Sequence, residues 1–474
     1  MSIIQRQSWV WAVLPERAAR VESRGDPALA EVLRDSGYES DGAPVDAVLF
    51  DTDGVPEPAE VQRAVAALAD GGVVSIAVAG GRPEPPASVP AVVRIVQLLA
   101  SPVETFKALG DARRAERALR GAGLTSRRIA TGDRSRRYGL GRGGWLRRLR
   151  TPTGFVLTGS RGPSPASLLE TAMARAGESV GVGLERRSTT VFESGKVMMA
   201  VRSDDGQDLF MRLAAGPAQR PLSASIEAVA GVAGAGPPAS VGDRLVVPLA
   251  HGWVGPLRYS LEPSAPGSHP WRLTAEVWED ALAFLVELWR LDLSASEVPE
   301  ALPFAVQAGR MLEYLDTAER EQLAAVVEGL ERRLGDLPRG QSHGDFWSEN
   351  LLVRDGRLAT VLDWEWSVRG ALPLLDLFDM IALSRRRLRD FTPGERLTEV
   401  LLPLARAGGD ERTVDYCRRA GVTVDLATIE GLATAYWLDR VSRQLGSLSL
   451  VPHRPGWLEG NLHEPLRQLS AAGR

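Results

Sequence analysis

The pattern of hydrophobic residues changes near residue 185, and this change limits the possible fold more than any other feature of the sequence. Before it, apolar runs such as VDAVLFD (45–51) alternate with helical patterns such as PAEVQRAVAALADGG (58–72). Such alternation predicts a parallel, doubly wound α/β sheet. After it, three strand-like runs joined by tight turns span 188–214, and a mainly helical pattern begins near residue 270. The chain is therefore expected to contain separate domains.

A length of 474 residues, at roughly 100–200 residues per domain, agrees with two to four domains. A cluster of Gly, Pro and Ser residues begins at position 161 and marks the boundary between the two halves. We expect four segments: a Rossmann-like α/β domain over 1–165, a linker over 166–185, an antiparallel small lobe over 186–267 and a helical large lobe over 268–474.

The composition is that of a soluble globular protein, with 44% hydrophobic and 24% charged residues. A net charge of −4 gives no general attraction to nucleic acid or anionic membranes, so neither is expected as a partner. No run approaches the ~18 apolar residues of a membrane span, and we recognise no signal peptide. The single cysteine, Cys417, excludes an internal disulfide and fits a reducing compartment. We therefore expect a cytoplasmic protein.

Polar residues that could carry chemistry are densest in HGDFWSENLLVRDGRLATVLDWE, residues 343–365. The runs NLLV and LATVLDW predict two strands of a hairpin around the turn RDGR. Such a hairpin brings Asn350, at the start of the first strand, close to Asp363, at the end of the second. Asp345 lies on the loop beside them. The three side chains are therefore expected to face one point.

These three residue types suit phosphoryl transfer to a hydroxyl group. That reaction needs an acceptor for the hydroxyl proton and oxygen ligands for the Mg²⁺ that bridges the nucleotide phosphates. Asp345 is the candidate catalytic base. Asn350 and Asp363 are the candidate metal ligands, because Mg²⁺ prefers hard oxygen donors.

HGDFWSEN together with VLDWE resembles the HGDxxxxN and DWE motifs of the aminoglycoside phosphotransferase / choline kinase family, and the resemblance covers roughly residues 186–465. That family has a fold similar to protein kinases. The resemblance therefore implies an α+β bilobal protein-kinase-like domain after the α/β Rossmann-like domain. It also implies an enzyme that transfers the γ-phosphate of ATP (or GTP), with Mg²⁺, to the hydroxyl group of a small molecule. A catalytically silent pseudokinase that only binds nucleotide is the alternative.

The resemblance also assigns nucleotide-binding residues in the small lobe. Arg212 takes the place of the basic residue that grips the nucleotide phosphates, and Glu227 that of the acid which orients it. An arginine in place of the usual lysine keeps the charge but differs in shape. Lys196, in a turn between the first two strands, could cover the phosphates instead. The backbone from Glu262 to Ser264 matches the linker that reads the adenine base.

Two further residues match positions that shape the catalytic loop in the family. His343 is expected to hold the conformation of the loop rather than to act as a base. Asp376 is expected to brace the loop from the start of a helix. The tryptophans at 347, 364 and 366 fit either core packing or stacking on a substrate.

Acids near the predicted acceptor pocket would give it a negative potential, which would suit an amine-bearing substrate. A sugar-like acceptor remains open as well. The alternative for each acid is an ordinary solvated position on a helix surface. The acids in question are Glu349, Glu365, Asp379, Glu430 and Asp439.

The N-terminal segment carries two competing resemblances. AVLFDTDG resembles the first motif of haloacid dehalogenase-type phosphatases, with Asp51 as nucleophile and Asp53 as acid/base, but Gly80 stands where a phosphate-binding Ser or Thr is required. The order of strands and helices resembles the second half of a class I methyltransferase-like domain. The Gly-rich turn that would approach S-adenosylmethionine is missing, so we expect a degenerate domain. A bifunctional protein with an active N-terminal methyltransferase or phosphatase is the alternative. The Arg-rich stretch 134–150 fits either a solvated loop or a contact with an anionic partner.

Overall fold

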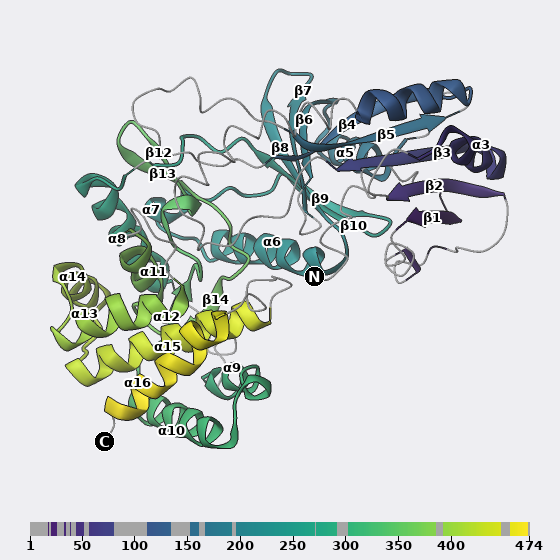
Figure 1. Cartoon of the computed structure of the whole chain (residues 1–474). Helices are drawn as coiled ribbons and strands as arrows, with labels where there is room; N and C mark the ends of the chain where they lie inside the picture. Colours follow the sequence, from purple (N-terminus) through teal and green to yellow (C-terminus); the bar gives the residue numbers. More distant parts are fainter. Residues whose placement is uncertain are drawn as a thin grey trace. The chain divides into compact units, whose positions relative to one another are not determined.

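The computed structural model of the chain is shown in Figure 1. By their contacts the residues form two compact units, which we call the sheet unit (residues 2–222 and 248–264) and the helical unit (residues 223–247 and 265–474). The structure describes residues 18, 20–25, 33–34, 38, 44–51, 56–79, 111–133, 152–160, 166–191, 196–270, 272–291, 302–384, 392–446 and 456–472.

The sheet unit begins with a five-stranded sheet in the order β1-β2-β3-β5-β4 (Figure 1). β1, β2 and β3 run parallel, as predicted, whereas β5 pairs antiparallel with both β3 and β4. The expectation of a parallel sheet is therefore wrong at β5, which follows β4 in the chain and needs no crossover helix to pair with it. The strands are β1 (Val21–Gly25), β2 (Val45–Asp51), β3 (Leu68–Ala79), β4 (Thr125–Asp133) and β5 (Pro152–Ser160).

The two faces of this first sheet are buried in different hydrophobic clusters. Val48 and Phe50 of β2 pack in a cluster with α3 (Pro58–Ala67) and the helical residues 111–121. Leu49 points to the opposite face, because side chains alternate along a strand. It belongs to the cluster that also contains the second sheet of this unit. The first sheet and the second sheet therefore share part of their core.

Helix α3 is shorter than its sequence pattern suggests. Pro58 occupies the first turn, as expected for a helix start. The helix ends at Ala67, and Leu68 already opens β3, so the predicted helix over 58–72 is too long. The glycine pair at 71–72, which the pattern places at the helix end, lies within the strand.

The segment expected to be a linker, 166–185, contains a helix. The hydroxyl of Ser167 accepts the Glu170 N–H at the start of α5 (Leu168–Val180), and Gly181 ends the helix with φ 76°. Helical spacing of its apolar residues gives α5 a face that has to be buried. The residues of that face, which lie in the same cluster as the second sheet, are Leu168, Leu169, Ala172 and Ala176.

The second sheet is antiparallel, in the order β6-β7-β8-β10-β9. The three strand-like runs predicted over 188–214 are confirmed as β6, β7 and β8, and helix α6 (Gln219–Gly234) follows them before β9 and β10. β9 is a short strand of five residues. The strands are β6 (Leu184–Val191), β7 (Lys196–Ser203), β8 (Asp208–Ala214), β9 (Ala250–Val254) and β10 (Leu257–Pro263).

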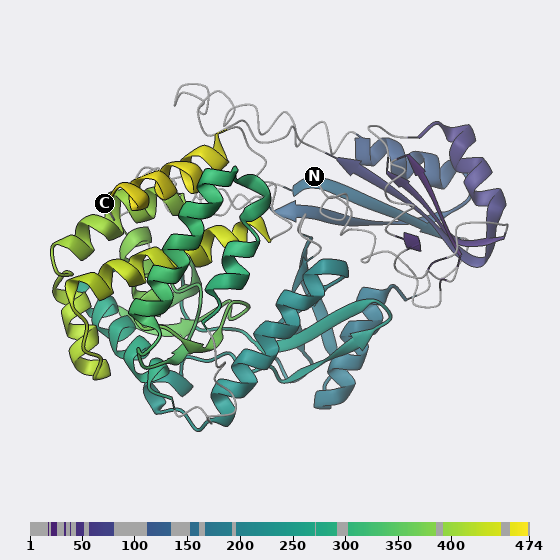
Figure 2. The ribbon, with the colours of Figure 1, turned by 90° about the horizontal axis from the view of Figure 1, so that it is seen from below.

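The helical unit has one large hydrophobic core to which most of its helices contribute, and α10 packs against both α15 and α16 (Figures 1 and 2). Its helices are α7 (Ala239–Gly242), α8 (Ala275–Trp289), α9 (Phe304–Gly309), α10 (Thr317–Leu334), α11 (Leu375–Ser384), α12 (Pro393–Glu395), α13 (Leu402–Arg406), α14 (Glu411–Ala420), α15 (Leu426–Leu445) and α16 (Glu464–Ala472). In the described part of the chain, no helix combines the length and apolar character needed to cross a bilayer.

Two short strand pairs lie within the helical unit. β12 (Leu351–Arg354) and β13 (Arg357–Val361) form the hairpin predicted around RDGR. β11 (Gly340–Ser342) pairs antiparallel with β14 (Val368–Ala371). The loop between β11 and β12 is the segment that carries the candidate catalytic residues.

Candidate active site

The loop between β11 and β12 turns at a position that requires glycine. Gly344 has φ of +83°, and a Cβ at this position would lie 1.9 Å from the carbonyl oxygen of Trp366. A side chain would collide with the backbone and would also hold a left-handed conformation that L-residues disfavour. Gly344 therefore determines where the loop turns, directly before Asp345.

Asp376 holds one side of the loop backbone. It lies in the first turn of α11, and its two carboxylate oxygens accept the N–H groups of His343 and Gly344, each at 2.7 Å. Hydrogen bonds to an ionised carboxylate are stronger than neutral ones, and a carboxylate is favoured at a helix N-terminus. This geometry supports a bracing role for Asp376.

His343 is fully buried, and both nitrogens of its ring are engaged. Nδ1 accepts the Asp345 N–H at 3.3 Å, so Nε2 carries the proton and donates to the carbonyl oxygen of Leu362 at 2.9 Å. Burial lowers the pKa of His343, although the charges of Asp376 and Asp345 act in the opposite direction. A neutral ring with both nitrogens bonded is suited to shaping the loop and has no nitrogen left for a substrate proton.

Asn350 holds the Asp345 carboxylate in place. Its Nδ2 donates to the backbone carbonyl of Asp345 at 2.8 Å and to Asp345 Oδ2 at 2.9 Å. The Trp347 indole N–H approaches the same Oδ2 at 3.3 Å. No described residue hydrogen-bonds the second oxygen, Oδ1. One carboxylate oxygen is thus fixed and the other is open to a ligand.

Asp363 follows the second strand and lies at the same end of the hairpin as Asn350, as the sequence predicts. β12 and β13 pair from Leu351 opposite Val361, and the Leu362 N–H donates to the Asn350 carbonyl oxygen at 2.8 Å. Asp363 is exposed, and its φ of +65° is uncommon for a residue other than glycine. Backbone conformations of this kind concentrate at functional sites.

Asn350 and Asp363 together form an oxygen donor set that fits Mg²⁺. Because the Asn350 amide nitrogen is used by Asp345, its oxygen Oδ1 remains open, and no described residue bonds the Asp363 carboxylate. Among the residues that the structure describes, no three His, Cys, Asp or Glu side chains are grouped to hold a metal ion by themselves. A cation at this site would complete its coordination with phosphate oxygens and water, as Mg²⁺ commonly does.

Two arginines that the sequence did not single out hold the other side of the loop. Nη1 of Arg440 and Nη1 of Arg443, both on α15, donate to the carbonyl oxygen of Gly344, each at 2.6 Å. The N–H groups of His343 and Gly344 thus face the Asp376 carboxylate, and the Gly344 carbonyl faces two guanidinium groups. No local pattern marks the two arginines, because Arg440 is 96 residues from its partner in the chain.

Three of the acids expected to make the acceptor pocket negative are paired with arginines. Fully buried Asp379 bonds Arg440 and accepts the Tyr436 hydroxyl at 2.6 Å. Burial raises the pKa of Asp379 to about 6, against the influence of Arg440. Asp439 pairs with Arg443 at 2.8 Å. Glu430, the third of these acids, accepts a hydrogen bond from Arg406 at 3.2 Å. Asp379 and Glu430 meet arginines that lie far along the chain, whereas Arg443 is one helix turn from Asp439.

The buried carboxylate of Asp280 links the β12–β13 hairpin to α8. Asp280 accepts hydrogen bonds from Arg357 Nε at 2.7 Å and from the Leu358 N–H at 3.0 Å. The hydrogen bond from Arg357 is the largest cause of the lowered pKa of Asp280. The position of β13, and with it that of Asp363, therefore depends on a helix that precedes it by many residues.

The candidate phosphate-binding residues lie on one face of the second sheet. Leu209, Met211 and Leu213 of β8 are buried in the core on the other face. Arg212 alternates with them and so points away from the core, as does Lys196 at the start of β7 next to buried Val197. The two cations predicted to meet phosphates thus share a face of the sheet.

Arg212 pairs with Glu262. Its Nε and Nη2 both donate to Oε1 of Glu262, at 2.8 and 2.6 Å. Glu227, the acid that the sequence assigns to Arg212, is exposed on α6 and bonds no described residue. The N–H of Ser264 donates to the Asp208 carbonyl oxygen at 3.2 Å, so this donor of the predicted adenine linker is already engaged.

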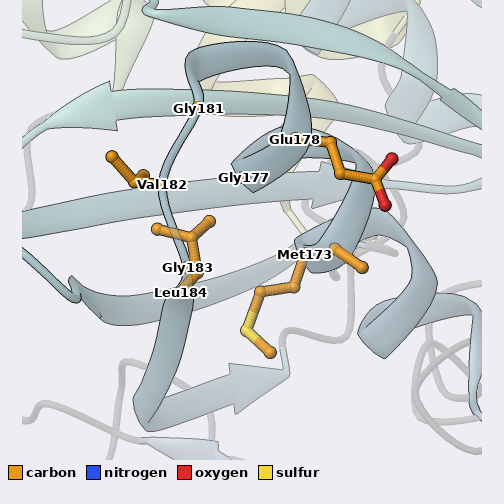
Figure 3. A pocket seen from close by; sticks show the side chains of 8 residues that line it. Met173, Gly177, Glu178, Gly181, Val182, Gly183 and Leu184 are labelled. Atoms are coloured by element: carbon orange, nitrogen blue, oxygen red, sulfur yellow. The ribbon is translucent and has the colours of Figure 1, made fainter.

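A shallow hollow lies where α5 leads into β6 (Figure 3). Its lining contains one charged side chain, that of Glu178, beside Met173, Val182 and Leu184. Such a lining offers neither a paired acid and base nor a group of cations. The hollow therefore does not compete with the loop between β11 and β12 as a site for chemistry.

Asp345 and Asn350 thus lie on the loop between β11 and β12, and Asp363 follows the second strand of the hairpin. Residues 198–416, slightly less than half of the chain, match the model of the family described as "Phosphotransferase enzyme family", abbreviated APH. The matched range includes these three residues and Arg212. No curated protein matches the chain.

Solved structures that are similar to this chain include several aminoglycoside phosphotransferases. A thermostable mutant of APH(4)-Ia in complex with ADP and hygromycin B is 17% identical, with 64% of this chain and 100% of that chain covered and a TM-score of 0.43. APH(3'')-Id from Streptomyces rimosus is 17% identical, with 56% and 97% covered and a TM-score of 0.36. ADP-bound APH(2'')-Ib is 14% identical, with 63% and 97% covered and a TM-score of 0.40.

Several residues named for the N-terminal segment lie outside the described residues. They are Asp53 and Gly80 of the phosphatase resemblance and the Arg-rich stretch 134–150. Asp51 is described as the last residue of β2.

Proposed function

We propose that residues 186–474 form a small-molecule kinase that transfers the γ-phosphate of ATP (or GTP) to a substrate hydroxyl group with Mg²⁺. The observation that carries this proposal is the grouping of Asp345, Asn350 and Asp363 at one end of the β12–β13 hairpin. The family match over residues 198–416 supports it independently.

Asp345 is proposed as the residue that orients and deprotonates the acceptor hydroxyl. Its Oδ2 is fixed by Asn350 and Trp347, so the open Oδ1 would accept the hydroxyl proton. Phosphoryl transfer needs little covalent chemistry from the protein and depends mainly on positioning and charge. The bonds to the loop backbone from Asp376, Arg440 and Arg443 would supply that positioning.

The nucleotide would be held by two groups of residues. Arg212 and Lys196, on one face of the second sheet, are proposed to bind its phosphates. Asn350 and Asp363 would hold Mg²⁺, which when bound neutralises developing charge on the phosphate oxygens. The backbone near Glu262 and Ser264 remains the proposed position of the base.

The acceptor is proposed to be a small molecule, and paired acids argue against selection by negative charge alone. Asp379, Asp439 and Glu430 are each bonded to an arginine. An amine-bearing or sugar-like acceptor would then be recognised chiefly by hydrogen bonds and shape.

Substitution of Asp345 tests the function. Asp345→Asn is expected to lower kcat by about 10²–10⁴-fold on an accepted hydroxyl compound, because it removes the proton acceptor. The affinity for ATP with Mg²⁺ is expected to stay unchanged, as measured by calorimetry. A wild-type chain that binds ATP but phosphorylates none of a broad set of sugars, amino alcohols and nucleosides would favour the pseudokinase.

We also propose that the first sheet is a degenerate methyltransferase-like domain without a bound cofactor. Three parallel strands, with α3 between β2 and β3, support a Rossmann-like origin. A thermal-shift titration of the full chain with S-adenosylmethionine is expected to give no shift. A saturable rise in melting temperature would contradict this proposal and favour a bifunctional protein.

A further inference from the structure

We infer that Glu262 on strand β10, rather than an acid on helix α6, is the residue that positions Arg212 for the nucleotide phosphates. This inference rests on the proposed kinase function and assigns the Glu262 side chain a role in phosphate binding, beside the proposed role of its backbone in base recognition. Glu262 would be a positioning residue, because it acts on the phosphates through Arg212.

The Glu262 carboxylate is fixed by three donors on one oxygen. Nε and Nη2 of Arg212 donate to Oε1 at 2.8 and 2.6 Å, and the Ser260 hydroxyl donates to the same atom at 2.6 Å. The register of β8 and β10 sets Ser260 opposite Arg212, so the three side chains share one face of the sheet. Charge-assisted bonds of this kind hold a guanidinium group in one orientation.

Burial places the carboxylate behind the guanidinium group. The side chain of Glu262 is 9% exposed and that of Arg212 is 21% exposed, while Ser260 is fully buried. The other face of the sheet is closed by the hydrophobic core. In the described part of the chain, the exposed surface of this pair lies mainly on Arg212, so a ligand would meet the guanidinium group first.

Helix α6 turns a different residue inward from the one that the motif pattern suggests. Ser225, Ile226 and Val229 are buried, whereas Glu227 is exposed. Glu227 makes no hydrogen bond or ion pair with the residues that the structure describes. The acid on this helix is thus exposed, whereas an acid of the sheet pairs with Arg212.

This arrangement has a consequence for nucleotide binding. Because Arg212 and Glu262 lie on adjacent strands of one sheet, their ion pair forms with the sheet and does not require a helix to move into place. Preassembly of this kind lowers the cost of ordering side chains when a ligand binds. The cation that meets the phosphates would be oriented before nucleotide arrives.

Nucleotide binding to full-length variants tests the inference. Glu262→Gln keeps the size of the side chain but removes its charge. We expect its Kd for ATP with Mg²⁺ to rise about tenfold, because a charge-assisted bond is weakened. The Kd for adenosine, which has no phosphate, is expected to stay unchanged. Glu185→Gln, an exposed acid on β6, serves as the matched control.

A double-variant cycle shows whether Glu262 acts through Arg212. Arg212→Gln alone is expected to weaken ATP binding, and adding Glu262→Gln should cause no further loss. Ser260→Ala, which removes one of the three donors, is expected to raise the Kd for ATP about threefold. The Kd of Ser260→Ala tests the inference independently if the Glu262→Gln variant does not fold.

The possible results separate this inference from the proposed function. If the wild-type chain binds no ATP, both are overturned. If it binds ATP and Glu262→Gln and Ser260→Ala leave the Kd unchanged or lower it, only the inference is overturned. The same holds if Glu227→Gln weakens ATP binding in place of Glu262→Gln, or if adenosine binding weakens as much as ATP binding.

Discussion

At the scale of single residues, two glycines can be compared: Gly344 in the loop between β11 and β12, and Gly356 in the turn of the β12–β13 hairpin. Gly344 and Gly356 both have a left-handed backbone, with φ of +83° and +77°. A Cβ at position 344 would meet backbone at 1.9 Å, whereas nothing lies within 4 Å of a Cβ at position 356. A side chain at position 356 would therefore suffer backbone strain alone, whereas one at position 344 would suffer strain and a steric collision.

Alanine substitutions at these two glycines are expected to differ in their effect on phosphotransfer. Gly356→Ala should cost about 1–2 kcal/mol of stability, the cost of a left-handed L-residue, and leave kcat close to that of the wild type. Gly344→Ala adds a collision with the Trp366 backbone. Because the loop has to shift to relieve it, Asp345 moves as well, and kcat should fall much further. Urea unfolding and steady-state kinetics of both variants measure this. Equal kinetic effects would contradict the role assigned to Gly344.

At the scale of secondary-structure elements, α15 holds the loop between β11 and β12 through Arg440 and Arg443. We expect Arg443→Gln to lower kcat about tenfold, because Gly344 loses one of two charge-assisted hydrogen bonds and the loop loosens. The Kd for ATP should stay unchanged, since Arg443 is not among the proposed nucleotide-binding residues. Arg418→Gln, which removes a pair on the surface of α14, is the control. A loss confined to nucleotide affinity would show that Arg443 does not act through the loop.

The contact between α8 and the hairpin gives a prediction with a defined pH dependence. Asp280 has a lowered pKa in the folded state, chiefly because Arg357 donates to it. As pH falls, the unfolded chain therefore takes up the proton first, near pH 3.9. The stability that Asp280 contributes is present above that pH and is lost as pH falls toward its folded pKa.

Asp280→Asn is accordingly expected to lower the free energy of unfolding by about 1–3 kcal/mol at pH 7. The difference from the wild type should stay constant down to about pH 5 and shrink below pH 4, because asparagine does not titrate. Urea titrations between pH 7 and 3 measure it. Asp355→Asn, at an exposed turn residue of the same hairpin, should change neither value. A difference that grows as pH falls would contradict the assignment.

The same elements show which parts of the candidate site could be predicted from the sequence. The hairpin could be predicted because its turn, its two strands and the residues at their ends are all local in the chain. The partners of the loop could not, since Arg440 and Arg443 lie about a hundred residues away on a helix with no motif. The side of helix α6 that faces inward could not be predicted for another reason. Small and apolar residues occur on most of its sides, so the pattern does not determine whether Ser225 or Glu227 faces inward.

At the scale of the whole molecule, the boundary between compact units does not follow the predicted domains. The first sheet, α5 and the second sheet lie in one unit, while residues 223–247, which include most of α6, and residues 265–474 form the other. Leu49 of the first sheet belongs to the same hydrophobic cluster as Met199 and Met211 of the second. The N-terminal segment thus contributes to the core that supports the proposed phosphate-binding strands, even if it carries no chemistry itself.

Two substitutions of the same kind test this sharing of a core. Leu49→Ala and Leu334→Ala each remove a fully buried leucine and should each cost about 2–5 kcal/mol. Because Leu49 lies in the cluster of the sheet unit, its loss should speed amide exchange in β7 and β8 as well as in β2. Leu334 lies in the core of the helical unit, so its loss should affect α10 and α15 and leave β8 protected. Exchange measured by mass spectrometry on the full chain distinguishes the two. If Leu49→Ala changes exchange only within the first sheet, the N-terminal segment is an independent domain and its core is not shared.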